Sequence, residues 1–237
     1  MYIPPIVQKY KYKEYSRIEG GPLGRLYANG NQKLPSVTTI LSNTMDHEFL
    51  ELWRERIGTD NAERITKEAA LCGTFMHENL ERRLIGQEDH QGSMPVRAIG
   101  RKMADVIQAN AWPSISEVWG QEVKLIMPGL WAGTTDLVGI HNGEPAIMDY
   151  KNARRHKEWG DILAYRMQIA AYALAHNELF GTDIRKGVIF ICNRKDPRNL
   201  EYTEYTVYGD DFEEAVHQWL NHVQKFYEQY GDKINEL

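Results

Sequence analysis

Apolar residues are spaced along the chain in patterns that predict helices and strands. In six stretches they recur every three or four residues, the spacing that gathers them on one face of an α-helix. The first stretch is short and follows Ser36, whose side chain is suited to cap a helix. The longer predicted helices cover residues 46–57, 61–85, 96–110, 161–180 and 210–230.

Extended stretches occupy the second half of the chain. Continuously apolar or alternating runs predict three successive strands and, after a helix, two more. The predicted strands cover residues 117–127, 132–141, 144–151, 187–193 and 202–208. This order of elements predicts an α/β fold with a mixed β-sheet core flanked by helices.

The turn between the second and third predicted strands contains Asn142-Gly143, a strong hairpin signal because a type I′ turn needs positive φ at both central residues. A two-residue loop fixes the register and places Asp136 opposite Asp149. Such a pair without mutual hydrogen bonds has Cα atoms about 4.5 Å apart and both side chains on one face. Lys151, two residues beyond Asp149, lies on the same face.

Two carboxylates placed in this way repel each other. Unless one of them takes up a proton, the natural remedy is a divalent cation, and Mg²⁺ or Mn²⁺ prefers carboxylate and carbonyl oxygens. The ammonium group of Lys151 would then steady a bound hydroxide or a developing phosphate charge. The pattern therefore predicts a hydrolytic metal site, although the same residue types also occur at the ends of ordinary surface strands.

Length and composition narrow the class of protein. With 237 residues, of which 42% are hydrophobic, we expect a single domain over residues 1–237, mainly helical at 1–113 and with the sheet core at 114–237. The two cysteines are too few for an iron–sulfur cluster with four cysteine ligands. No signal peptide, transit peptide or membrane span is evident, so we expect a cytoplasmic protein without a membrane partner.

The formal charge of −5 argues against a protein that coats nucleic acid by bulk electrostatics. A nucleic-acid partner would instead be held by local basic clusters. One such cluster follows Lys151 and includes Arg154 and Arg155, which we take as candidate DNA-binding residues.

Three motifs resemble those of a known nuclease family. Asp136, followed after twelve residues by Asp149-Tyr150-Lys151, resembles the signature of the PD-(D/E)XK nucleases. Gly73-Thr74-x-x-His77-x-x-x-Glu81 and Gln168-x-x-x-Tyr172 resemble the RecB-type branch of that superfamily. The segments 34–41 and 52–58 are similar to the mitochondrial genome maintenance exonucleases and their bacteriophage relatives.

This resemblance implies a restriction-endonuclease-like fold and a role for each matching residue. The implied metal ligands are His77, Asp136, Asp149 and the backbone carbonyl of Tyr150. The implied catalytic lysine is Lys151, and Gln168 and Tyr172 would contact the phosphate region of the substrate. Glu122 matches a glutamate often present in this branch, and Glu81 would serve either as a further acid or as a partner of His77.

The segment that begins at Leu34 helps to frame the DNA path in the group that it resembles. Here Ser36, Thr38 and Thr39 offer hydroxyl and N–H groups near a helix start, where a phosphate would be stabilised. The alternative for these three residues is a helix cap with no role in binding. Aromatic candidates for stacking on bases are Tyr10, Tyr12, Trp53 and Trp159.

The resemblance implies a Mg²⁺-dependent DNA exonuclease, with Mn²⁺ able to substitute and no iron–sulfur cluster. We expect it to degrade single-stranded DNA from a free end, in bacterial or phage DNA replication, recombination or repair. One alternative is a structure-specific or restriction-like endonuclease with the same site. The alternative of another class is a non-catalytic DNA-binding protein of this fold. The sequence carries no P-loop, so it has no helicase motor of its own.

Overall fold

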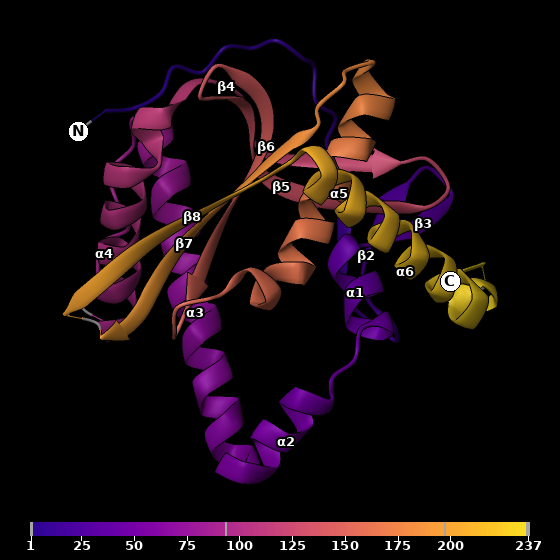
Figure 1. The fold of residues 1–237 in the computed structure, drawn as a ribbon, viewed down its shortest axis with the longest axis horizontal. Helices are drawn as coiled ribbons and strands as arrows, with labels where there is room; N and C mark the ends of the chain where they lie inside the picture. The colour runs from indigo at the N-terminus through magenta and orange to yellow at the C-terminus, as the bar shows by residue number, and fades with distance from the viewer. Residues whose placement is uncertain (1, 93, 197, 236–237) are drawn as a thin grey trace.

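A five-stranded mixed β-sheet forms the centre of the protein (Figure 1). The computed structural model describes residues 2–92, 94–196 and 198–235. The strand order is β4-β5-β6-β7-β8, with β6 and β7 parallel and the other neighbours antiparallel. The strands are β4 (Ile115–Met127), β5 (Trp131–His141), β6 (Glu144–Ala153), β7 (Lys186–Asp196) and β8 (Asn199–Tyr208).

Helices cover both faces of this sheet, as the alternation of predicted helices and strands indicated (Figure 1). One core cluster joins the sheet to α3 (Thr59–Leu84) and α4 (Pro95–Asn110). The other joins it to α5 (Leu163–Phe180) and α6 (Gly209–Asn235), with α1 (Val37–Thr44) at its border. Short 3-10 helices, η1 (Trp112–Ser114) and η2 (Trp159–Ile162), precede β4 and α5.

The hairpin of β5 and β6 confirms the predicted turn. Asn142 and Gly143 have φ values of 49° and 83°, and His141 pairs with Glu144. The predicted register holds as far as Leu137 opposite Met148, the pair farthest from the turn. The ladder ends one step before the two acids, so the backbone pairing expected between them is not formed.

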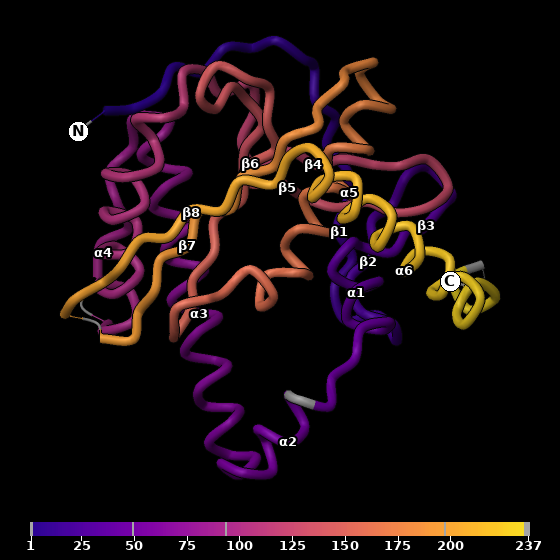
Figure 2. Tube along the Cα trace, viewed as in Figure 1, coloured from indigo at the N-terminus to yellow at the C-terminus, as the bar shows by residue number. Residues whose placement is uncertain are grey.

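A second, three-stranded antiparallel sheet lies in the N-terminal part, which the sequence pattern had indicated as mainly helical. Figure 2 places its strands beside α1. They are β1 (Ser16–Gly21), β2 (Gly24–Asn29) and β3 (Gln32–Pro35). Each has four to six residues and buries few side chains, so none carries a clear alternation of its own. Tyr27 and Leu34 instead pack against Ile126 and Ala132 of the main sheet.

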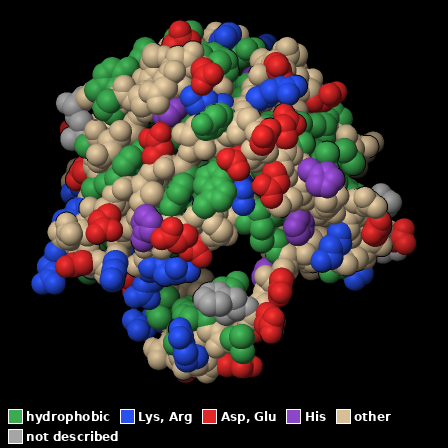
Figure 3. Space-filling view, viewed as in Figure 1, with side chains coloured by type: hydrophobic (Ala, Val, Ile, Leu, Met, Phe, Trp, Pro, Cys, Tyr) green, Lys and Arg blue, Asp and Glu red, His purple; other side chains and the backbone are tan. Residues whose placement is uncertain are grey.

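A helical projection extends from the body of the protein. It consists of α2 (Glu48–Ile57) and the first turns of α3, joined at Gly58, whose φ of 83° is a conformation that favours glycine. Figure 3 shows an opening between this projection and the body. None of the helices in the described part of the chain is long and apolar enough to cross a membrane.

Candidate active site

The candidate site lies where β5 and β6 separate. Because their ladder ends at Leu137 and Met148, the backbone N–H of Tyr150 has no backbone partner on β5. The Asp136 side chain fills this place, and its Oδ2 accepts that N–H at 2.6 Å. Its Oδ1 lies 3.2 Å from Nδ1 of His77, which is a residue of α3. Asp136 therefore joins the two strands to α3.

Glu122 completes a group of metal-ligating side chains. The neighbouring residues of β4 pair with Leu137 and Thr135, so Glu122 lies opposite Asp136. Its φ is 49°, a left-handed conformation that costs about 1–3 kcal/mol in a non-glycine residue and that clusters at functional sites. Ligand atoms of His77, Glu122 and Asp136 all lie within 4.8 Å of one another, which makes them a possible metal-binding group among the described residues.

Asp149 and Lys151 form an ion pair beside this group, as their placement on one face of β6 predicted. Asp149 is only 3% exposed, whereas the Lys151 side chain keeps 19% of its surface exposed. The carboxylate of Asp149 turns toward Lys151 and does not belong to the group of donors within 4.8 Å. The acid that the structure brings to Asp136 and His77 is therefore Glu122.

Burial and mutual repulsion shift the pKa values of these groups. Burial, together with the charges of Asp136 and Glu81, raises the pKa of Glu122 to about 8. Burial also raises the pKa of Asp149 to about 6, against the opposing effect of Lys151. Burial alone would lower the pKa of His77, but Asp136 raises it to about 9. Without a cation the group thus holds protons at neutral pH, and a divalent ion would displace them.

Glu81 lies one helical turn after His77 on α3. Burial raises its pKa, the His77 charge lowers it, and the Asp136 charge raises it further. Glu81 also lines a small cavity with His77, Glu122 and Asp136. The structure thus places Glu81 beside the metal-ligating group, as the sequence spacing suggested.

The side chains of Gln168 and Tyr172 lie on α5, on the side of the sheet that carries Asp149. Gln168 Nε2 donates to the Tyr172 hydroxyl at 2.9 Å, as their one-turn spacing allows. Gln168 and Tyr172 are 9% and 3% exposed. They therefore offer little surface to a substrate and support the site from the interior of the protein. Tyr172 fits there because Gly133 of β5 has no side chain: a Cβ would meet its ring at 2.4 Å.

A residue that the sequence analysis did not single out borders the site. Tyr165 is half-buried on α5, and the Lys151 ammonium lies 5.1 Å from the centre of its ring. The available signal was its spacing, because Tyr165 lies three positions before Gln168 and therefore on the same helical face.

Of the three candidate DNA contacts in the N-terminal segment, two use their hydroxyl groups within the fold. Ser36 Oγ caps α1 by accepting the N–H of Thr39, and Thr39 Oγ1 donates to the carbonyl of Arg25. Ser36 and Thr39 are both buried, so their hydroxyl groups are used within the fold. Of the three residues, Thr38 remains exposed.

The basic residues after β6 lie at the surface. Arg154 and Arg155 are both exposed, and Arg155 pairs with Asp161 at 3.1 Å. They remain available to a nucleic acid.

Two of the aromatic candidates pack against other aromatic side chains. Tyr10 and Tyr12 pack against His176 and Phe180, so they belong to an internal cluster.

Comparison with known proteins identifies the family. The sequence profile of the PD-(D/E)XK nuclease superfamily matches residues 44–236, a range that contains every residue of the metal-ligating group. The chain belongs to the PD-(D/E)XK nuclease superfamily. The mixed sheet flanked by helices is the restriction-endonuclease-like core of these nucleases, which confirms the predicted fold class. None of the curated proteins matches the sequence.

Solved structures similar to this PD-(D/E)XK nuclease include exonucleases. A candidate exonuclease from Eubacterium rectale has a TM-score of 0.50 and 15% identity, covering 69% of this chain and 68% of its own. The alkaline exonuclease LHK-Exo from Laribacter hongkongensis has a TM-score of 0.28 and 14% identity, covering 69% and 84%. Its complex with dAMP has a TM-score of 0.36 and 12% identity, covering 71% and 88%. At these identities the likeness concerns the fold alone.

PD-(D/E)XK nucleases use divalent metal ions, and the residues present fit one. An imidazole nitrogen and two carboxylates converge within 4.8 Å, and carboxylate oxygens are the ligands that Mg²⁺ and Mn²⁺ prefer.

Proposed function

We propose that this protein is a Mg²⁺-dependent deoxyribonuclease that hydrolyses phosphodiester bonds of single-stranded DNA from a free end. The observation that carries the proposal is the metal-ligating group of His77, Glu122 and Asp136 beside the Asp149–Lys151 ion pair. An acidic metal site next to a partly buried ammonium suits the hydrolysis of a phosphate ester, in which negative charge develops on oxygen.

Each residue of the site has a part in this chemistry. His77, Glu122 and Asp136 would hold Mg²⁺, with Asp149 and the Tyr150 carbonyl as the further ligands that the family resemblance implies. When bound, the ion would polarise the scissile phosphate and lower the pKa of a water molecule. Mn²⁺, with the same ligand preferences, would substitute for it.

Lys151 supplies the second charge. Asp149 and Asp136 raise the pKa of its ammonium group, although burial opposes them, so it stays protonated at neutral pH. From the face of β6 that it shares with Asp149, Lys151 would orient the attacking water and stabilise the charge on the phosphate. Gln168 and Tyr172 of α5 would support Asp149 and Lys151 from the interior of the protein.

The projection of α2 and α3 supports the choice of a single strand with a free end. The opening between the projection and the body (Figure 3) lies beside the first turns of α3, the helix that also carries His77 (Figure 1). A strand that passes through such an opening must be threaded from an end, which suits a single strand with a free end. A restriction-like endonuclease would share the site but would not need a free DNA end.

One assay tests the proposal. The wild-type protein is incubated with end-labelled linear single strands, linear duplex and circular single strands, each with Mg²⁺ and with EDTA. We expect cleavage of the linear single strand alone, and only with Mg²⁺. Cutting of the circle would establish the endonuclease alternative, and loss of metal dependence would remove the proposed chemistry.

A variant separates catalysis from binding. Asp149→Asn keeps the volume of the side chain but removes its charge, so we expect cleavage to fall by about 10²–10³-fold while single-stranded DNA is still bound. Unchanged cleavage by this variant would exclude the assigned site. A wild-type protein that binds but does not cut under any of these conditions would be the non-catalytic alternative.

A further inference from the structure

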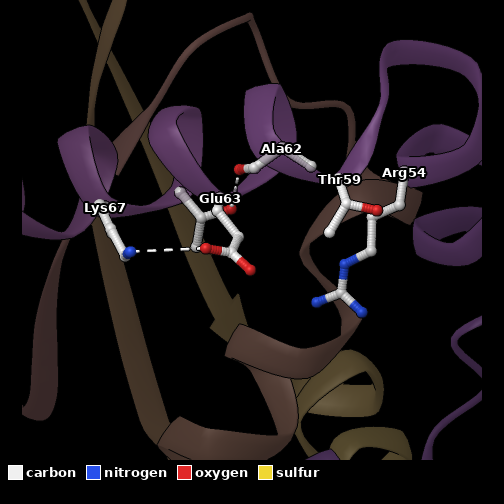
Figure 4. A pocket seen from close by; sticks show the side chains of 6 residues that line it. Arg54, Thr59, Ala62, Glu63 and Lys67 are labelled. Atoms are coloured by element: carbon white, nitrogen blue, oxygen red, sulfur yellow. Dashed lines mark hydrogen bonds and ion pairs between the residues drawn. The ribbon is translucent and has the colours of Figure 1, made fainter.

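A cavity lined by charged, hydroxyl and apolar groups lies in the elbow between α2 and α3, away from the candidate active site. Its volume is about 360 Å³. Figure 4 shows the side chains that line it, which reach from the two helices to the same side. The lining consists of two cations, one carboxylate, two hydroxyl groups and one methyl group, from Arg54, Lys67, Glu63, Thr59, Thr66 and Ala62.

The electrostatics of this cavity favour an anion. Glu63 is already paired with Lys67 at 3.4 Å, so the guanidinium group of Arg54 provides the net charge. Among the described residues, no hydrogen bond or ion pair engages the Arg54 side chain. The cavity also contains the N-terminal end of α3, where Gly58 offers no side chain to cap the first N–H groups. Free N–H groups and the helix dipole at such an end favour a phosphate.

The cavity lies along the face of α3 that carries His77. At 3.6 residues per turn, Thr59 is five turns before His77 and Thr66 is three, so all three side chains lie on one side of the helix. A rise of about 1.5 Å per residue puts Thr66 about 16 Å and Thr59 about 27 Å from His77 along the axis. A strand held at the metal site can therefore reach the cavity only if it extends several nucleotides.

We propose that the α2–α3 elbow is a second phosphate-binding subsite, which holds the backbone of the single-stranded substrate a few nucleotides away from the cleaved bond. This inference rests on the proposed function. Arg54 and the N-terminal end of α3 contact the phosphate, and Lys67 turns from Glu63 toward it. The Thr59 hydroxyl donates to its oxygens, whereas the Thr66 hydroxyl already donates to the Ala62 carbonyl at 2.8 Å. The subsite binds any sequence, because it reads only the backbone.

Two single substitutions and a matched control test the subsite. Arg54→Gln and Lys67→Gln each remove one positive charge from the cavity. Arg64→Gln removes one from an exposed position of α3 that does not line the cavity. The side chains concerned are exposed, so thermal unfolding should be the same for all three variants. Cleavage kinetics are measured with Mg²⁺ on a dinucleotide and on a strand of about 30 nucleotides, and binding of the long strand is measured in EDTA.

We expect Arg54→Gln and Lys67→Gln to raise KM for the long strand by about three- to tenfold, with kcat unchanged. Cleavage of the dinucleotide, which is too short to reach the elbow, should match that of the wild type. In EDTA the slope of log affinity against log salt concentration should fall by about 0.7, the value for one lost phosphate contact with a single strand. Arg64→Gln should leave all three quantities unchanged.

The outcomes distinguish the subsite from the function on which it rests. If the wild type cleaves DNA but the two cavity variants behave like Arg64→Gln, the subsite is wrong and the proposed function stands. An equal loss on the dinucleotide would also overturn it, because the effect would then arise at the metal site. A wild type that cleaves neither substrate would remove the proposed function and the subsite together.

Discussion

At the scale of single residues, Glu122 is the most informative member of the site. Its backbone is held at a φ of 49°, and its carboxylate lies with the His77 imidazole and the Asp136 carboxylate in the metal-ligating group. We predict that Glu122→Gln raises the Mg²⁺ concentration needed for half-maximal cleavage by about 10–100-fold, because a charged ligand is lost. The measurement is a Mg²⁺ titration of the cleavage rate.

Glu78→Gln provides the control for this prediction. Glu78 follows His77 on α3 but pairs with His90 at 3.4 Å, away from the metal-ligating group. The Mg²⁺ dependence of this variant should equal that of the wild type. A Glu122 variant with the same dependence as the control would contradict the role of Glu122 as a ligand.

Asp149 and Lys151 differ from Glu122 in how the sequence determines their positions. Asp149 and Lys151 share a strand, so their common face follows from the alternation of side chains along it. The position of Glu122 depends on two irregularities in the register of β4 with β5 and on its own left-handed backbone. No local pattern encodes these features, because they arise from the way β4 packs.

At the scale of elements, the contact between β5 and α5 determines how Tyr172 packs beside the site. The Tyr172 ring occupies the space where Gly133 lacks a side chain. Gly133→Ala should therefore lower the free energy of unfolding by about 1–3 kcal/mol and reduce cleavage, since the ring must move. Gly160→Ala is the matched control, because a Cβ there meets no atom within 4 Å. Urea unfolding of both variants checks the prediction, and equal midpoints would contradict it.

Most elements of the fold could be predicted from the sequence, because each carries its own apolar period. The helix predicted at residues 96–110, for example, is found at Pro95–Asn110. The small N-terminal sheet could not be predicted in this way. Its strands are short, and their stability comes from contacts with distant parts of the chain, including the bridge between Ser36 and Ala132.

At the scale of the whole molecule, His176 joins the N-terminal segment to α5. Its Nε2 lies 3.1 Å from the Tyr12 hydroxyl, and its Nδ1 lies 2.8 Å from Oγ1 of Thr182. Burial, with a smaller effect of Lys9, lowers the pKa of His176 to about 4. The unfolded chain takes up a proton near pH 6.5, whereas the folded protein does not until about pH 4. Stability is therefore lost as the pH falls from about 6.5 toward 4.

A substitution isolates this effect. Between pH 7 and pH 5 the wild type should lose about 1–2 kcal/mol more of its free energy of unfolding than His176→Gln, which cannot take up the proton. Urea unfolding at the two pH values gives both differences, and all other titrating groups are common to the two proteins. Equal losses would show that His176 does not set this part of the pH dependence.

The helical projection described above also has a consequence for local stability. Leu50 and Leu52 of α2 are 45% and 56% exposed, and α2 packs mainly on α3. It can therefore open without disturbing the sheet, so its backbone amides should exchange with deuterium much faster than those of the buried α5. Mass spectrometry of peptic fragments would measure both rates. Slower exchange in α2 when a long single strand is added would show that the substrate, and not the core, holds this helix in place.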